Sequence, residues 1–397
     1  MESPWILRYP IERLNLARTL SLHIEEEFLR RLLAGILVVA GCSRGEKGPI
    51  VLGLAGPFSQ PRGASMQHAA ELAVKEINAR GGIRGRLLAL RIMDDSARGD
   101  VAIRIARTLL DDPSVVAVIG HLTSGTSLAA GRVYGEGRRP VVMISPSASS
   151  PDLSGVNPYV FRICPSDLSH GAQLARFARM TLGARRVGVI YVDDDYGRGL
   201  RLSFAAEFRR LRGEIVGEDP VLSTTPSLEP YLSRLRRGGG VDAVMLATER
   251  GGAELALRDM ARIGVRWPAL GGDALTGIEG AGPLAEGVHV SSAYLVDRPG
   301  VRNERFVQAY AAAYPGERPD HRGAGAYDIV QLLATVFIEA GTDRRAIRDR
   351  VAQIGTEAPA FEGVTGTIVF DARGDVPAKS VVIGAVRAGR LVTEAAQ

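Results

Sequence analysis

Hydrophobic and polar positions along this chain alternate in blocks that predict strands and helices in regular succession. Short apolar runs of strand length are separated by segments with apolar residues three and four positions apart, the spacing of one helix face. The strands predicted in the first part of the chain are 50–54, 87–93, 115–119 and 141–144. A loop at 56–63 and amphipathic helices at 64–79 and 100–110 lie between them. This alternation is typical of a parallel sheet covered by helices on both faces.

The same rhythm restarts near residue 162 and predicts a second unit of similar size. Its predicted helices are 168–182, 200–211, 228–236 and 252–263. Its predicted strands are 187–192, 214–218, 243–247, 269–271 and 288–292. Three consecutive helices are predicted next, at 302–314, 324–340 and 344–354. A β-like end follows at 367–370 and 381–386. Because this closing block is short for a third domain, we expect it to pack back onto the first two units.

Two of the predicted strands end in runs of small hydroxylic residues. Thr-Ser-Gly-Thr-Ser occupies 123–127, and Ser-Pro-Ser-Ala-Ser-Ser occupies 145–150. Loops at the carboxyl ends of parallel strands bind ligands in open α/β sheets, and a helix beginning at Ser124 would add the positive end of its dipole. Side by side, the two loops would cradle a small anion such as a carboxylate. In the alternative interpretation, Ser124 and Ser127 are helix caps and 145–150 is an ordinary turn.

The N-terminal segment has the pattern of a secretion signal. Arg30 and Arg31 precede an apolar run that is too short to span a bilayer, and Val-Ala-Gly-Cys at 39–42 resembles the lipobox of bacterial lipoproteins. This predicts a signal peptide over 1–41, acylation of Cys42 and a linker over 42–49. The alternative is a buried helix that ends in a cysteine. An acidic triplet at 25–27 departs from the basic character of such signals, and a start codon assigned too early would explain it.

The composition excludes several classes of protein. The 397 residues are 46% hydrophobic and 23% charged, so the chain can bury sizeable cores. Its net charge of +5 comes from arginines scattered over helix faces without interleaved aromatic residues, which argues against nucleic acid as a partner. The two cysteines and six isolated histidines have no metal-site spacing. Since the nucleophile-elbow, phosphate-loop and dinucleotide motifs are also absent, we expect no enzyme and no cofactor.

Several segments resemble the branched-chain amino-acid-binding proteins of bacterial ABC importers. The resemblance rests on Gly-Pro-Phe at 56–58, AVKEINARGGIRG at 73–85, VIGHL at 118–122, ISPSASSPDL at 144–153, Tyr-Gly at 196–197 and FEGVTGTIVFDARGD at 361–375. It runs from about residue 50 to residue 391. It implies the type I periplasmic binding protein fold, an α/β architecture of two Rossmann-like, doubly wound lobes joined by three hinge crossings. Ligand would bind between the lobes as they close.

The resemblance also implies where the lobes divide. The crossings are expected near 162–165, 292–294 and 366–368. The first lobe would then comprise residues 50–163 and 294–365, and the second would comprise residues 164–293 and 366–395.

Roles for single residues follow from the same resemblance. Ser124 and Ser149 stand where the family's hydroxyls hold the α-carboxylate of the ligand, and Ser147 and Ala148 would lend backbone groups. Asp273 occupies the acidic position that takes the α-ammonium group. Tyr196 matches an aromatic residue of the second lobe that reaches across the cleft. Hydroxyls stabilise a carboxylate and a carboxylate selects an ammonium group, so the pair would reject simple acids and simple amines.

The side-chain end of the expected site departs from the family pattern. Arg62 stands where many members have an aromatic residue, and Glu249 and Arg250 replace a segment that is often aromatic. Polar groups desolvate poorly against leucine or valine, so a polar or acidic ligand is an alternative to a branched-chain amino acid. In the opposing interpretation, Arg62 and Arg250 point into solvent.

We therefore expect an extracytoplasmic, lipid-anchored and monomeric substrate-binding protein. It would bind an amino acid or a related small molecule and deliver it to the membrane subunits of an ABC permease. The alternative is a ligand sensor of the same fold that binds amides or small carboxylates for a regulatory partner. The sequence does not separate these two functions, because both use a cleft that closes on ligand.

Overall fold

The computed structural model describes Met1 and residues 48–394. The first part of the chain forms a five-stranded parallel sheet in the order β2-β1-β3-β4-β5. Its strands are β1 (Ile50–Gly56), β2 (Leu88–Asp94), β3 (Val115–Gly120), β4 (Val142–Ser145) and β5 (Val160–Arg162). Every residue of β3 and β4 is buried, which explains why both strands read as continuous apolar runs in the sequence.

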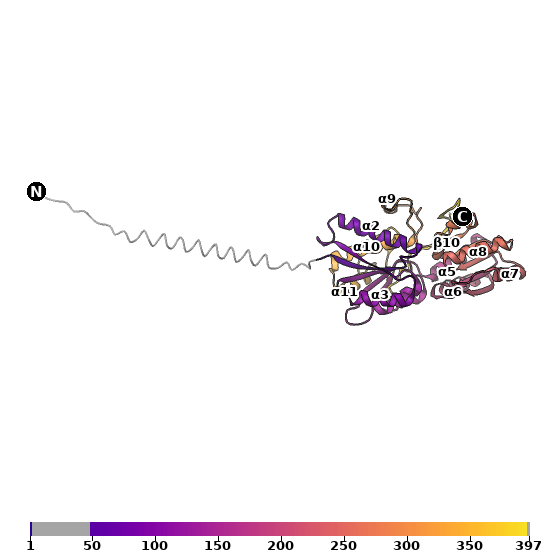
Figure 1. Cartoon of the computed structure of the whole chain (residues 1–397), viewed down its shortest axis with the longest axis horizontal. Helices are drawn as coiled ribbons and strands as arrows, with labels where there is room; N and C mark the ends of the chain where they lie inside the picture. The colour runs from indigo at the N-terminus through magenta and orange to yellow at the C-terminus, as the bar shows by residue number, and fades with distance from the viewer. Residues whose placement is uncertain (2–47, 395–397) are drawn as a thin grey trace. The chain divides into compact units, whose positions relative to one another are not determined.

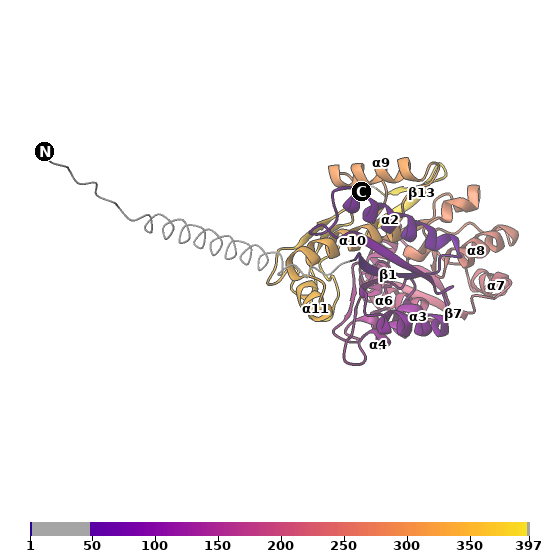
Figure 2. The same ribbon diagram turned by 60° about the vertical axis from the view of Figure 1, so that its left-hand side comes forward.

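Helices cover both faces of this sheet. On one face, α2 (Pro61–Ala79), α10 (His321–Ala340) and α11 (Arg344–Ala352) share a core with β1, β3 and β4. On the other face lie α3 (Gly99–Asp111) and α4 (Ser124–Tyr134), and Figure 2 shows them on the opposite side of β1 from α2 and α10. By length and composition α10 could cross a membrane, but 67% of its apolar window is buried, as in a core helix. Helix α9 (Val301–Ala313) packs on the outside of α2.

The second sheet has seven strands in the order β14-β13-β10-β9-β8-β6-β7. Five of them run parallel: β6 (Arg186–Val192), β7 (Glu214–Val221), β8 (Ala243–Ala247), β9 (Ala269–Gly271) and β10 (His289–Ser292). The hairpin of β13 (Val382–Arg387) and β14 (Arg390–Thr393) adds to β10 in the antiparallel sense.

Helices cover both faces of the second sheet as well. One face packs against α5 (Asp167–Arg176), its continuation η2 (Phe177–Thr181) and α6 (Asp195–Arg210). The other packs against α7 (Glu229–Arg237) and α8 (Arg250–Arg262). Figure 1 shows α2, α3, α10 and α11 gathered in one lobe and α5 to α8 in the other. The chain is thus two doubly wound α/β lobes within the compact unit Pro49–Gln397.

Most of the predicted elements are present, with ends that differ by a few residues. The predicted loop over 56–63 is an exception, because α2 begins inside it at Pro61. Proline is well tolerated in the first helical turn, where its missing N–H has no partner to lose. The strands β5 and β11 (Phe361–Gly363), each of three residues, are not among the predicted elements.

The first two crossings between the lobes lie close to their predicted positions. After β5 the chain reaches α5 of the second lobe within four residues, through Cys164 and Pro165. After β10 it returns to the first lobe, where Tyr294 packs against residues of α2 and α9.

The third crossing lies later than predicted. Strand β12 (Gly366–Ile368) pairs with β11, and Ile368, Phe370 and Val376 pack in the core of the first lobe. The predicted crossing at 366–368 and the predicted start of the second lobe at 366 are therefore wrong. The chain leaves the first lobe after Val376 and enters the second sheet at Val382. An apolar pattern marks residues 367–370 as buried, but it does not say which of two sheets covers them.

Candidate functional site

A cavity of about 470 Å³ lies between the two lobes, at the carboxyl ends of their parallel strands. Its wall includes seven of the predicted site residues, Arg62, Ser124, Ser147, Ser149, Tyr196, Glu249 and Asp273. The first lobe contributes the two hydroxylic loops and the start of α2, and the second contributes the starts of α6, α8 and η3 (Asp273–Leu275). Residues far apart in the sequence therefore meet around one gap.

The two hydroxylic loops lie side by side because β3 and β4 are neighbours in the sheet. The cap of α4 is Thr123, whose Oγ1 accepts a hydrogen bond from the Thr126 N–H. The interpretation of Ser124 as the cap is therefore wrong, and Ser124 is the first helical residue. Its Oγ accepts a hydrogen bond of 3.1 Å from the Ser150 N–H. The hydroxyl proton remains available for a ligand oxygen at the positive end of the helix dipole.

Ser147 and Ser149 of the second loop line the cavity, but Ala148 does not. The Oγ of Ser147 lies 3.1 Å from His321 Nε2. The Ala148 N–H donates to Ser145 Oγ, and its carbonyl accepts from Arg162. Because both backbone groups of Ala148 are used inside the first lobe and its side chain packs in the core, the structure does not bring Ala148 to the site.

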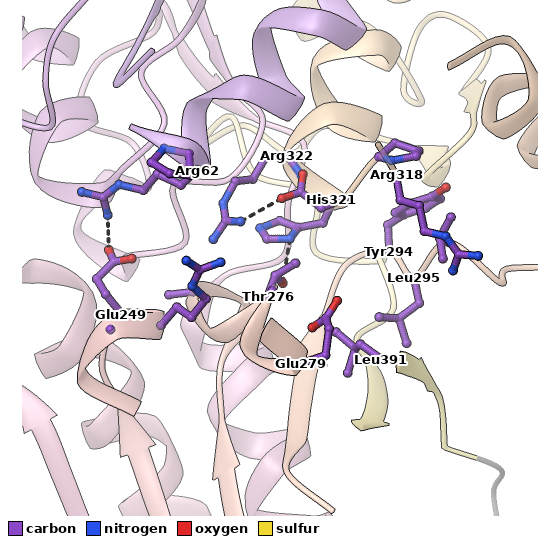
Figure 3. Close-up of a pocket in the computed structure, with 18 of the residues that line it drawn as sticks. Arg62, Glu249, Thr276, Glu279, Tyr294, Leu295, Arg318, His321, Arg322 and Leu391 are labelled. Carbon is purple, nitrogen blue, oxygen red and sulfur yellow. Dashed lines mark hydrogen bonds and ion pairs between the residues drawn. The ribbon is translucent and has the colours of Figure 1, made fainter. Parts of the chain in front are cut away.

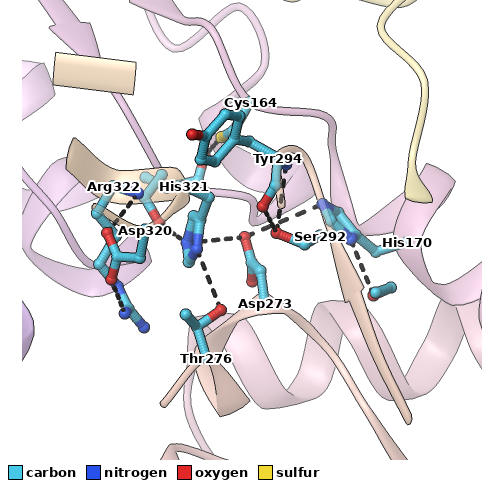
Figure 4. A network of polar contacts seen from close by, with 12 residues as sticks. Cys164, His170, Asp273, Thr276, Ser292, Tyr294, Asp320, His321 and Arg322 are labelled. Carbon is cyan, nitrogen blue, oxygen red and sulfur yellow. Dashed lines mark hydrogen bonds and ion pairs between the residues drawn. The ribbon is translucent and has the colours of Figure 1, made fainter. Parts of the chain in front are cut away.

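Asp273 is buried at the second-lobe side of the cavity, with 3% of its surface exposed. Among the described residues its Oδ2 has no hydrogen-bond partner, and it lies 3.7 Å from His321 Nε2 and 4.0 Å from His170 Nε2 (Figure 4). Burial lowers the pKa of His321 to about 4 and that of His170 to about 3, so both rings are neutral at pH 7. Because both histidines are neutral, Asp273 has no protonated histidine beside it, and burial raises the pKa of its carboxyl group.

Asp167, at the start of α5, is a second buried carboxyl group that the sequence reasoning missed. Neither of its oxygens accepts a hydrogen bond from a described residue. Burial, and next the charge of Asp273, raises its pKa well above the usual value. A signal was present in the sequence, since an aspartate follows directly after the first predicted crossing. Asp167 is not in the wall of the cavity, whereas Asp273 is, and the unpaired Oδ2 of Asp273 suits a positively charged group of a ligand.

Tyr196 lies in the second-lobe wall beside these acids. Its hydroxyl has no hydrogen-bond partner among residues 48–394 and sits against Gly272, where an added Cβ would lie 2.3 Å from the hydroxyl oxygen. A larger residue at 272 would displace the ring. The Tyr196 hydroxyl thus lies against its own lobe, and its reach across the cleft stays a prediction.

The lobes touch on one side of the cavity and are bridged on another. An added Cβ on Gly199 of α6 would lie 2.8 Å from Pro151 of the first lobe. In the wall of the cavity, Arg62 Nη1 of α2 lies 2.7 Å from Glu249 Oε1 at the start of α8 (Figure 3). The interpretation of Arg62 as a solvent-facing residue is therefore wrong. Arg250 is half exposed and pairs with Glu254 at 3.2 Å, so it lies outside this cavity.

A second, larger cavity of about 770 Å³ adjoins the first and includes Arg250 in its wall. The two share five wall residues, namely Arg62, Ser223, Glu249, Ala274 and Arg322. Arg322, on the first turn of α10, is a site residue that the sequence reasoning missed.

Other sequence-based expectations concern metals and thiols. Over residues 48–394 no group of three or more histidine, cysteine, aspartate or glutamate side chains is arranged to hold a metal ion. Cys164 is buried, and burial raises the pKa of its thiol to about 12, so the thiol is unreactive at neutral pH. Cys42, the predicted site of acylation, lies outside the described residues.

Comparison with known proteins identifies the family. A family model described as "periplasmic binding protein" matches residues 49–390. The chain belongs to the periplasmic binding protein family. Among curated relatives, Leu/Ile/Val-binding protein homolog 1 of Brucella suis is 27% identical over 350 residues, which cover 86% of this chain and 91% of that protein.

Solved structures of similar proteins have the same fold. An ABC transporter substrate-binding protein of Desulfitobacterium hafniense in complex with Leu is 32% identical, with a TM-score of 0.75 over 87% of this chain and 100% of that chain. A leucine-binding protein of Thermotoga maritima is 26% identical, with a TM-score of 0.79 over 87% of this chain and 98% of that chain. The predicted resemblance and the predicted fold class are therefore confirmed.

Proposed function

We propose that this periplasmic binding protein is the extracytoplasmic substrate-binding subunit of an ABC importer and binds an amino acid or a related small molecule between its lobes. The observation that carries the proposal is the buried Asp273 in the wall of the inner cavity, whose Oδ2 lacks a hydrogen-bond partner within the described part of the chain. An ionised carboxylate in such a place is costly unless a cation compensates it. A ligand ammonium group supplies that cation.

The opposite wall suits the other charge of an amino acid. Ser124 and Ser149 stand at the ends of β3 and β4, and the N-terminus of α4 directs its dipole toward the same space. A ligand α-carboxylate there accepts hydrogen bonds from hydroxyls and free N–H groups. A zwitterion thus joins an anion-binding wall of the first lobe to a cation-binding wall of the second, and its binding favours the closed arrangement.

The remaining features of the proposal concern location and partners. Leu/Ile/Val-binding and ABC transporter proteins among the relatives support delivery of ligand to a permease. The lipobox-like sequence before Cys42 supports a lipid anchor at the membrane, and we propose a monomer that binds its ligand without transforming it. The anchor has its own test. Replacing Cys42 by alanine is expected to move the protein from the membrane pellet to the soluble fraction, and retention in the pellet would refute the anchor.

Calorimetric titration of the purified chain with a panel of amino acids, amides and small carboxylates tests the proposed function. At least one α-amino acid is expected to bind, while its analogues without the amine or without the carboxylate bind far more weakly. The Ser124→Ala variant is expected to weaken binding by about tenfold or more, the loss of one hydrogen bond to a charged group. Failure of every compound in the panel to bind would overturn the proposal.

A further inference from the structure

The two adjoining cavities between the lobes carry opposite charge. The inner one, which contains the proposed head-group site, has four acids, Asp194, Asp195, Glu249 and Asp273, against two arginines in its wall. The larger one has five arginines, Arg62, Arg250, Arg318, Arg322 and Arg390, against three acids. His321 adds no charge there at pH 7, since burial lowers its pKa to about 4. A ligand that extends from the inner into the larger cavity therefore passes from a negative into a positive environment.

Arg322 stands at the junction of the two cavities. It lies in the wall of both, and only 6% of its surface is exposed. Its Nη1 donates to Asp320 Oδ2 at 2.8 Å, and Asp320 is the one ion-pair partner of this side chain among residues 48–394. Figure 3 shows the guanidinium between the Arg62–Glu249 pair and His321. An anchored, nearly buried guanidinium with nitrogens left over is well suited to bind a carboxylate.

The neighbouring groups limit what else could be bound at this junction. The nearest lobe-bridging cation, Arg62, is already paired with Glu249 at 2.7 Å and so contributes little net charge. Tyr294, Leu295 and Leu391 line part of the larger cavity with apolar surface, which suits a methylene chain. An aliphatic side chain alone would leave the Arg322 guanidinium desolvated without a ligand partner, which is unfavourable.

We propose that the ligand is an α-amino acid whose side chain ends in an anionic group, and that Arg322 binds this second anion. This inference rests on the proposed function, since it assumes the zwitterionic head group between Asp273 and Ser124. It names the substrate class that the proposed function leaves open, an acidic amino acid, and it assigns the choice between acid and amide to one side chain.

Matched pairs of ligands test the charge without altering the protein. The purified full chain is titrated calorimetrically with L-aspartate and L-asparagine, L-glutamate and L-glutamine, and L-2-aminoadipate and L-homoglutamine, with L-leucine as the aliphatic reference. In the best-bound pair the acid is expected to bind about tenfold or more tighter than its amide and than L-leucine, the size of a charge-assisted hydrogen bond.

Substitutions then assign that preference to a residue. In Arg322→Gln the acid-over-amide ratio is expected to fall to near one, with amide affinity changed less than about threefold. Arg322→Lys is expected to keep more of the preference than Arg322→Gln does. The exposed and remote Arg107→Gln is the matched control and is expected to keep all of it. If Arg322→Gln fails to fold, the acid-over-amide affinity ratio of the unaltered chain still tests whether the ligand carries a second anionic group.

The outcomes separate the inference from the proposed function. Tighter binding of L-leucine or of an amide than of every acid overturns the inference and leaves the proposed function standing. An equal loss of acid and amide affinity in Arg322→Gln overturns the role of Arg322. No binding by any of the seven amino acids, L-leucine included, overturns the inference, and the wider panel described above then decides the proposed function.

Discussion

Replacing Asp273 by asparagine should separate the contribution of this residue to binding from its contribution to stability. The side chain keeps its shape, but the negative charge beside the buried Asp167 is lost. Removing one partner of a buried charge pair costs about 2–5 kcal/mol of binding free energy, which is about 30-fold to several thousand-fold in affinity. The ligand-free protein should respond in the opposite sense.

The stability effect follows from the state of Asp273 without ligand. At pH 7 its carboxylate is buried, and its Oδ2 has no partner in the described part of the chain. Relieving the desolvation of such a group is worth about 1–3 kcal/mol. For a chain of this size, that is a rise of roughly 1–4 °C in the melting temperature. Asp273→Asn should therefore melt higher than the unaltered chain without ligand, while the ligand that stabilises the unaltered chain should no longer stabilise the variant.

Differential scanning calorimetry without ligand and calorimetric titration with the best ligand of the panel measure the two effects. The exposed Asp111→Asn on α3 is the matched control and should change neither quantity. The reasoning is refuted if Asp273→Asn binds ligand within about threefold of the unaltered chain, since a charge pair of this kind is worth more. A variant that loses binding and also melts lower would show that Asp273 holds the fold together instead.

Three further predictions concern pH, the bridge between the lobes and the fold. Burial raises the pKa of Asp273 in the folded chain, so the folded chain binds this proton more tightly than the unfolded chain does. The cost of the buried carboxylate to the free energy of unfolding therefore shrinks as pH falls from 7 toward that pKa. The difference in melting temperature between Asp273→Asn and the unaltered chain should narrow over this range, and a constant difference would contradict the assignment. The Arg62–Glu249 pair is one-quarter to two-fifths exposed, so a double-mutant cycle with Arg62→Gln and Glu249→Gln should give a coupling of about 1 kcal/mol or less in the free energy of ligand binding, and a much larger coupling would contradict its solvent-screened position. The buried Arg344 side chain donates hydrogen bonds to the carbonyls of Leu109, Leu110, Asp112, Val115 and Arg139. Arg344→Met should therefore lower the free energy of unfolding, measured by urea titration, by about 3–5 kcal/mol. A loss below about 1 kcal/mol would show that those carbonyls find other partners.

The pattern of the sequence predicted the strands best where burial is complete on both faces. Strands β3 and β8 are buried at every residue, so their apolar runs are unbroken and their ends are clear. The start of α2 was placed three residues late because the segment Pro-Phe-Ser-Gln-Pro reads as a loop, although Pro61 fits the first turn of a helix. The third crossing was misplaced because it depends on which lobe covers Phe370, which is a tertiary property.

The candidate site was only partly predictable for a similar reason. Ser124, Ser149 and Asp273 follow strand ends, so the parallel topology brings them to one edge. Arg322 lies at the start of α10, and nothing local in the sequence says that this helix start reaches the cavity. Within the second hydroxylic loop, the sequence does not tell which residues face the core. The sequence therefore predicts Ala148 in the site together with its neighbours, although its backbone groups bond within the first lobe.

The most direct measurement of the central claim is a crystal structure of the protein with the tightest ligand of the panel. We expect the ligand amine within hydrogen-bond distance, about 3 Å, of the Asp273 carboxylate, and the ligand α-carboxylate within the same distance of the Ser124 hydroxyl. A ligand bound in the reverse orientation, or bound outside the gap between the lobes, would contradict it.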